Sequence, residues 1–286
     1  MGKNYYALVA GLPDILLEDK KVLYSSAELR ENLSAELQPA DFKLVQLLYM
    51  PFDHQNFLNR YFKRDQEWDE RGNLPRDTVE QLQDRKSYEA ADLELLPDYF
   101  VEFLEQIHGE EGTDDFYAAE LQLTKAYYEH LDQVNNSFLR ALASYHRTIA
   151  NVMVALNGRK HELAFDQALV GDDEITAALR KSRTRDFGLA NEVHEMEHLI
   201  QLFEGKDLLE RELRLDRHQW DFIDEETFFA YFTIEKVLAF VQKLLIVERW
   251  MALDAERGKE MFNQLLNDLE AGFQFPEEFT LGYGKK

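Results

Sequence analysis

Residues 137 to 188 read SFLRALASYHRTIANVMVALNGRKHELAFDQALVGDDEITAALRKSRTRDFG. Apolar residues recur in the first half at intervals of three and four, which predicts an amphipathic helix that ends at Asn157-Gly158. A short linker would carry Arg159 and Lys160, and Asp172-Asp173 would start a second helix. A basic run closes that helix and consists of Arg180, Lys181, Arg183 and Arg185.

Long helices are also indicated on both sides of this stretch. Residues 116 to 156 hold no glycine or proline, which predicts one long helix or two nearly continuous ones, about 60 Å in length if unbroken. Thr227 to Leu253 is apolar around most of its circumference, so we expect a second long helix inside the core. Residue usage typical of helices and 45% apolar residues indicate an all-α bundle of long helices.

The remaining segments predict shorter elements. Tyr5 to Gly11 has a strand-like composition without a second strand, so we expect an extended arm. Ser25 or Ser26 would cap a helix through Leu37, Pro39 would begin the next, and Asp53 would cap another through Phe62. Further helices are expected over 77–86, 97–108 and 258–269, with an N-terminus at 113–115 and a loosely held tail from 276.

The polar stretch from 63 to 92 is the best internal boundary. We therefore expect an N-terminal helical region with its arm over 1–92 and a main long-helix domain over 93–286.

The net charge of the chain limits the classes of partner that it can bind. Fifty-five acidic and thirty-two basic residues give a net charge of −23, which disfavours nucleic acid and anionic membranes and favours a basic protein partner. The alternative is that the charge only maintains solubility. The chain has no cysteine, and the apolar segment 228–247 carries Glu235, Lys236 and Lys243. The apolar stretch Tyr5 to Val9 is short, so we do not expect secretion. A cytoplasmic protein without membrane insertion is expected.

The clearest match to an enzyme motif is the H-E-x-x-H sequence from His194 to His198, which in zinc hydrolases places two imidazoles beside a general base. Helical geometry places both histidines opposite an apolar stripe formed by Leu189, Val193, Met196, Ile200 and Phe203. We therefore expect a solvated histidine pair and no metal site, with a zinc metallohydrolase as the alternative.

No other catalytic motif has its required context. Asp186-Phe187-Gly188 lacks the upstream elements of a kinase, and no G-x-x-x-x-G-K-S/T loop is present. We expect no enzyme activity and no cofactor.

Two resemblances point to rotary ATPases. Asn151 inside an apolar helix, followed by Arg159 and Lys160, resembles the helix-Asn-helix-Arg-x-Lys pattern of the C-subunit family of V/A-type ATPases. The opening 5–14, the sequence Arg185-Asp186-Phe187-Gly188 and the segment 228–250 resemble more closely an uncharacterised bacterial family that accompanies such ATPases.

The resemblance implies a function. Members of the C-subunit family are all-helical, non-catalytic funnels of helical lobes that receive the central shaft and sit on the membrane rotor ring. For this chain the resemblance implies a central-stalk (rotor) role, peripheral to the membrane, in proton or sodium transport, with the shaft and the proteolipid ring of the V-type ATPase as partners. The expected partner-binding residues are Asn151, Arg159, Lys160, Arg180, Lys181, Arg183 and Arg185. Two alternatives remain open: the basic run only completes a helix C-terminus, or the chain is a freestanding helical scaffold.

Overall fold

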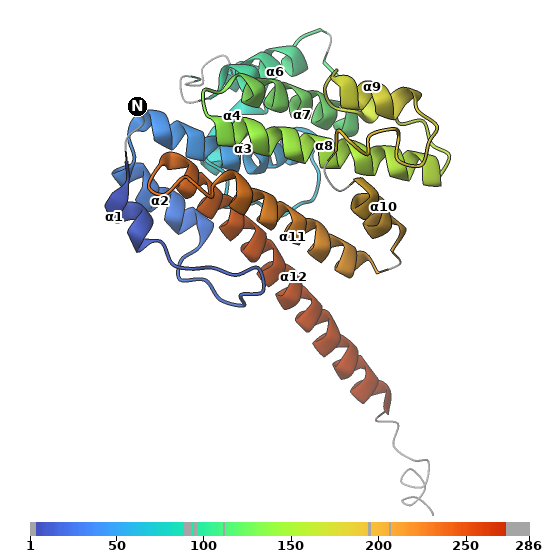
Figure 1. The fold of residues 1–286 in the computed structure, drawn as a ribbon. Helices are drawn as coiled ribbons and strands as arrows, with labels where there is room; N and C mark the ends of the chain where they lie inside the picture. Colours follow the sequence, from blue (N-terminus) through green and yellow to red (C-terminus); the bar gives the residue numbers. More distant parts are fainter. Residues whose placement is uncertain are drawn as a thin grey trace, which may run out of the picture.

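The computed structural model describes residues 4–88, 93, 96–110, 112–193, 196–205 and 207–272, with the backbone alone from 255 to 272. Within these residues the regular structure is helical (Figure 1), which confirms the all-α prediction. The helices are α1 (Tyr6–Gly11), α2 (Ser26–Glu36), α3 (Pro39–Tyr61), α4 (Arg76–Leu82), α5 (Arg85–Tyr88), α6 (Asp98–His108), α7 (Phe116–Gln133), α8 (Ser137–Lys160), the 3-10 helix η1 (Asp166–Ala168), α9 (Glu174–Lys181), α10 (Met196–Glu204), α11 (Leu208–Glu226) and α12 (Ile234–Gly272).

Several helices begin where local chemistry predicts. Ser25 forms a capping box with Glu28 at the start of α2, and Pro39 occupies the first turn of α3. The Asp115 and Asp173 side chains accept hydrogen bonds from backbone amides at the starts of α7 and α9. These caps satisfy amide groups that have no partner inside the helix.

Two hydrophobic cores lie side by side, and α8 belongs to both. The first core unites α2 to α7 with the start of α8 (Phe138 to Ala143) and the buried part of α12. The second unites the end of α8 (Val152 to Leu156) with α9, α10 and the segment between them. With 24 residues, α8 is about 36 Å long and runs from one core into the other (Figure 1).

Residues 116–156 form a helical hairpin rather than a rod. The helix breaks at 134–136, and α8 returns antiparallel beside α7 (Figure 1). Asn136 causes the break because its side chain caps α8 by accepting from the Leu139 amide at 3.0 Å. The alternative of two helices separated by a short break is therefore confirmed, and the unbroken rod of about 60 Å is wrong.

Asp53 does not cap a new helix, because α3 continues through Pro51 as far as Tyr61. Proline has no N–H, so the carbonyl of Leu47 loses its helical partner. The hydroxyl of Tyr127 donates to that carbonyl instead, at 2.9 Å. A side chain 80 residues away thus lets the helix pass the proline.

The second long helix begins at Ile234 rather than at Thr227, because Thr227 ends α11 and residues 228–233 connect the two helices. Phe228 and Phe232, expected in the core, are exposed. Gly258 does not start a separate helix, since α12 continues to Gly272. Among the described residues no helix has the length and apolarity that a bilayer span requires.

The prediction of an extended N-terminal arm was also wrong, because residues 6–11 form the helix α1. Without a neighbouring strand, this backbone satisfies its amides within a helical turn. Tyr5 is buried before it, and its amide donates to the Phe232 carbonyl at 2.7 Å. The helix expected over 77–86 is two short helices, α4 and α5.

Arg159 and Lys160 lie in the last turn of α8 rather than in a linker. The division at residue 92 stays a prediction, and residues from both ranges contribute to the first core. The tail from 276 lies outside the described residues.

Candidate functional site

Asn151 is a buried clamp within the second core. Its side-chain nitrogen donates to the Val170 carbonyl at 2.8 Å, and its oxygen accepts from the Val170 amide at 2.9 Å. Only 2% of the residue is exposed. Both hydrogen-bonding ends of the amide are therefore used to hold the segment before α9 against α8.

Arg159 holds the turn after α9. Its guanidinium lies 3.5 Å from the centre of the Phe187 ring and donates to the carbonyls of Ser182 and Thr184. Burial lowers the pKa of Arg159. The sequence predicted a partner contact, and the structure places the guanidinium on the chain itself.

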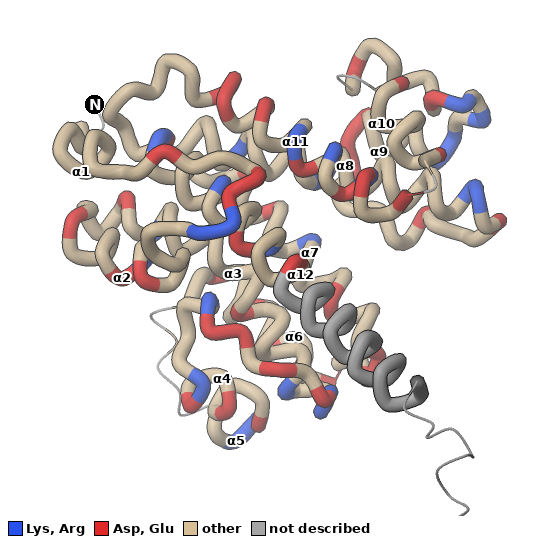
Figure 2. The backbone as a smooth tube through the Cα atoms, turned by 90° about the horizontal axis from the view of Figure 1, so that it is seen from below, with Lys and Arg blue, Asp and Glu red and all other residues tan. Residues whose placement is uncertain are grey.

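Two cations of the basic run, Arg180 and Arg185, form ion pairs within the chain. Arg180 pairs with Asp172 at 2.9 Å, and Arg185 bridges Glu197 and Glu204 of α10 at 2.7 and 3.1 Å. The hydrogen bonds that Arg185 donates to these two carboxylates raise its pKa. Figure 2 shows that the basic positions gather at the α9–α10 end. Lys181 and Arg183 of the run are exposed, as is Lys160 at the end of α8, and we call these three residues the basic end.

The H-E-x-x-H motif lies partly outside the described residues, which omit His194 and Glu195. The apolar stripe is buried in the second core as predicted, and His198 is exposed on the other side of α10. Glu197 between the histidines is paired with Arg185, which lowers the pKa of its carboxyl. In the part of the chain that the structure describes, no three metal-binding side chains come together.

A pocket of about 430 Å³ lies where α8 faces α11, between the two cores. Tyr145 projects from α8, and its hydroxyl lies 2.6 Å from Nδ1 of His218 on α11. The Phe222 ring stacks on Tyr145 with centroids 4.4 Å apart. Asp221 and Glu225 line the same wall. Carboxylates beside aromatic rings form an environment that attracts cations.

Sequence reasoning missed this pocket. The α11 residues 218, 221, 222 and 225 follow the spacing i, i+3, i+4 and i+7 and therefore share one helix face. That spacing could have indicated a shared face of α11, but it does not show that α8 lies opposite this face and closes the pocket.

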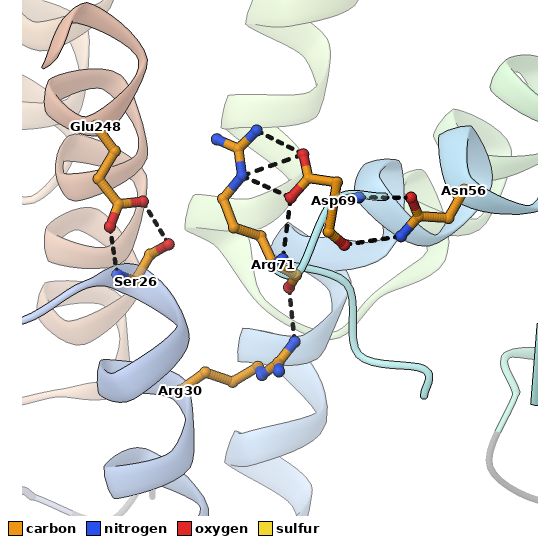
Figure 3. Close-up of polar contacts among 6 residues, drawn as sticks. All are labelled: Ser26, Arg30, Asn56, Asp69, Arg71 and Glu248. Carbon is orange, nitrogen blue, oxygen red and sulfur yellow. Dashed lines mark hydrogen bonds and ion pairs between the residues drawn. The ribbon is translucent and has the colours of Figure 1, made fainter. Parts of the chain in front are cut away.

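A polar network holds α12 and the loop before α4 against α2 (Figure 3). Glu248 accepts from the Ser26 amide and hydroxyl at 2.6 and 2.5 Å. Arg30 donates to the carbonyl of Arg71 at 2.6 Å, and Arg71 pairs with Asp69 at 2.6 Å. These charged groups satisfy one another and the backbone, so they support the fold.

Asp53 anchors the same loop from inside α3. Its carboxylate accepts from the backbone amides of Asn73 and Leu74 at 3.0 and 2.8 Å and from the Asn73 side chain at 2.7 Å. Burial outweighs these hydrogen bonds and raises the pKa of Asp53 to about 6. Gly72 is required here, since a Cβ would lie 2.6 Å from the Asp53 oxygen.

Comparisons with known proteins give a family and no function. No curated protein matches the chain, and no solved structure matches it. One family model, described as a protein of unknown function (DUF2764), matches residues 1–273, a range that includes both cores and every described residue of the site. The chain therefore belongs to the DUF2764 family.

Proposed function

We propose that this protein is a non-catalytic central-stalk component of a V/A-type ATPase, similar to the C-subunit family, and that it couples the rotating shaft to the membrane proteolipid ring. In this role it lies at the cytoplasmic face, held to the membrane by the ATPase and serving proton or sodium transport. The resemblance carried by Asn151, Arg159 and Lys160 motivates the proposal.

The observation that carries the proposal is the construction of α8. One helix is built into two hydrophobic cores, so a load applied to one core reaches the other through continuous helical backbone. Close-packed interiors deform little, which suits a part that transmits torque. Asn151 and Arg159 then act within the chain, by fixing the second core and its basic end to α8.

The basic end supplies a surface for one partner. Lys160, Lys181 and Arg183 are exposed on a protein of net charge −23, where they mark a local reversal of charge. A complementary acidic surface on the shaft or the ring would be recognised there.

Affinity purification in mild detergent at native expression level tests the assignment. Shaft and ring proteins should be recovered with the wild-type protein. Reversing Lys160, Lys181 and Arg183 to glutamate should weaken that recovery while the helical circular dichroism signal stays unchanged. A matched triple reversal of the exposed Lys21, Lys43 and Lys86 should leave recovery intact. Recovery of neither partner by the wild-type protein would refute the assignment.

Metal content separates this proposal from a zinc hydrolase. Stoichiometric zinc that is lost on His194→Ala would favour the hydrolase and count against the rotor role.

A further inference from the structure

Large aromatic side chains stand exposed on the connection between α11 and α12. Phe228, Phe229 and Tyr231 are 67%, 80% and 64% exposed. Tyr6 of α1 extends the same patch, with its ring 4.8 Å from that of Phe232. We call these five residues the aromatic end. Contiguous exposed apolar groups of this kind mark interaction sites in soluble proteins.

The aromatic end is held in place by backbone hydrogen bonds. Buried Thr227 donates its hydroxyl to the Ile223 carbonyl at 2.7 Å, and the Ala230 amide donates to the Thr227 carbonyl at 3.0 Å. The Phe232 carbonyl accepts from the Tyr5 amide at 2.7 Å. The rings are therefore presented on an ordered connection, which reduces the entropy that a binding partner would have to overcome.

Carboxylates border the aromatic end on one side. Asp224, Glu225 and Glu226 are exposed in the last turn of α11. On the other side of the aromatic end, α1 carries no charged residue. Asp224 is paired with Lys243 at 2.6 Å. A helix C-terminus favours cations, so Glu225 and Glu226 are unfavourable for α11 itself. Their placement is explained if cations of another molecule approach this border.

We propose that the aromatic end, with Glu225 and Glu226, is the docking surface for an amphipathic helical segment of a protein partner whose apolar face is bordered by lysine or arginine. The apolar face would cover the aromatic rings, and the cations would meet the two glutamates. Anionic lipid is disfavoured because the same carboxylates repel it.

This surface is distinct from the basic end. The two views place α1, which contacts the connection at Phe232, and α9 at opposite ends of the molecule (Figures 1 and 2). The inference goes beyond the proposed function and holds for any basic partner helix.

Fluorescence anisotropy with the full chain tests the proposal. The probe is a labelled leucine–lysine helical peptide of about 18 residues, and a leucine–glutamate peptide of the same pattern is its counterpart. The wild-type protein should bind the lysine peptide and not the glutamate peptide. Phe228→Ser with Phe229→Ser should weaken binding by about tenfold or more.

Matched variants separate docking from general attraction to an acidic protein. Tyr117→Ser with Leu163→Ser removes side chains that are 71% and 64% exposed elsewhere, and binding should stay within about twofold of wild type. Glu225→Gln with Glu226→Gln should weaken binding and reduce its salt dependence. The control Asp65→Asn with Glu67→Gln makes the same charge change at other exposed positions and should alter neither the binding nor its salt dependence.

Three results would overturn the proposal. The first is an equal loss of peptide binding in the Tyr117 and Leu163 control. The second is binding to phosphatidylglycerol vesicles that disappears with Phe228→Ser and Phe229→Ser, since that result assigns the aromatic end to a membrane. The third is a concentration-dependent dimer that the same two substitutions abolish, since that result assigns it to a second copy of the chain.

Discussion

Replacing Tyr127 with phenylalanine tests how α3 passes Pro51. The substitution removes one oxygen and leaves the ring, so it creates little empty space. The Leu47 carbonyl then loses its hydroxyl donor, which lies 2.9 Å away in a buried setting. A buried carbonyl without a partner costs about 1–3 kcal/mol. We expect the free energy of unfolding to fall by that amount.

A double-mutant cycle identifies the cause. Pro51→Ala restores a backbone amide that can donate to Leu47, so the carbonyl no longer depends on the hydroxyl. In that background Tyr127→Phe should cost less than about 1 kcal/mol. Urea unfolding followed by far-ultraviolet circular dichroism measures all four proteins. Tyr61→Phe is the control, because its hydroxyl donates to the Ile107 carbonyl at 3.1 Å and its cost should not change with Pro51→Ala. An equal cost of Tyr127→Phe in both backgrounds would refute the reasoning.

Three further substitutions test other buried positions. Burial raises the pKa of Asp53 from 3.8 to about 6, so protonated Asp53 stabilises the fold fully below about pH 4, and this contribution of up to ~3 kcal/mol is lost as pH rises through 6. Urea unfolding at several pH values should show this loss of stability. The pH dependence should be absent in Asp53→Asn. Gly158→Ala places a Cβ 2.3 Å from the Phe165 ring and should lower the free energy of unfolding by about 1–3 kcal/mol, which thermal unfolding would detect as a lower midpoint. Asn151→Ala leaves both backbone groups of Val170 without partners and should cost about 2–4 kcal/mol in urea unfolding.

The sequence predicted elements whose determinants are local. Ser25, Asp115 and Asp173 each satisfy amides within three residues of themselves, so their caps are visible in the chain. Pro51 shows the opposite case. Its effect on α3 depends on Tyr127, and nothing near Pro51 in sequence indicates that this hydroxyl will arrive. The break at 134–136 carried the local signal of Asn136, which the absence of glycine and proline outweighed in our interpretation.

The candidate site divides in the same way. The basic run was visible because cations are rare in this acidic chain. The pairing of Arg185 within the chain depends on Glu197 and Glu204, which α10 brings to it from 12 and 19 residues away. Phe228 was predicted in the core because the apolar pattern continues through the α11–α12 connection. Periodicity alone does not show that the helix begins at Ile234, so the aromatic residues before it were assigned to the buried helix.

The proposed mechanical role depends on the joint between the two cores, where a lone α8 would bend. Arg147 in the middle of α8 pairs with Asp132 of α7 at 2.5 Å and with Asp173, the cap of α9, at 3.7 Å. Its guanidinium therefore ties one helix from each core to the helix they share. Tyr145 braces α8 against α11 through the Phe222 ring and His218. Bending the joint would have to break an ion pair and separate stacked rings as well as strain α8, so Arg147 and Tyr145 hold the two cores as a unit in addition to the packing within each core.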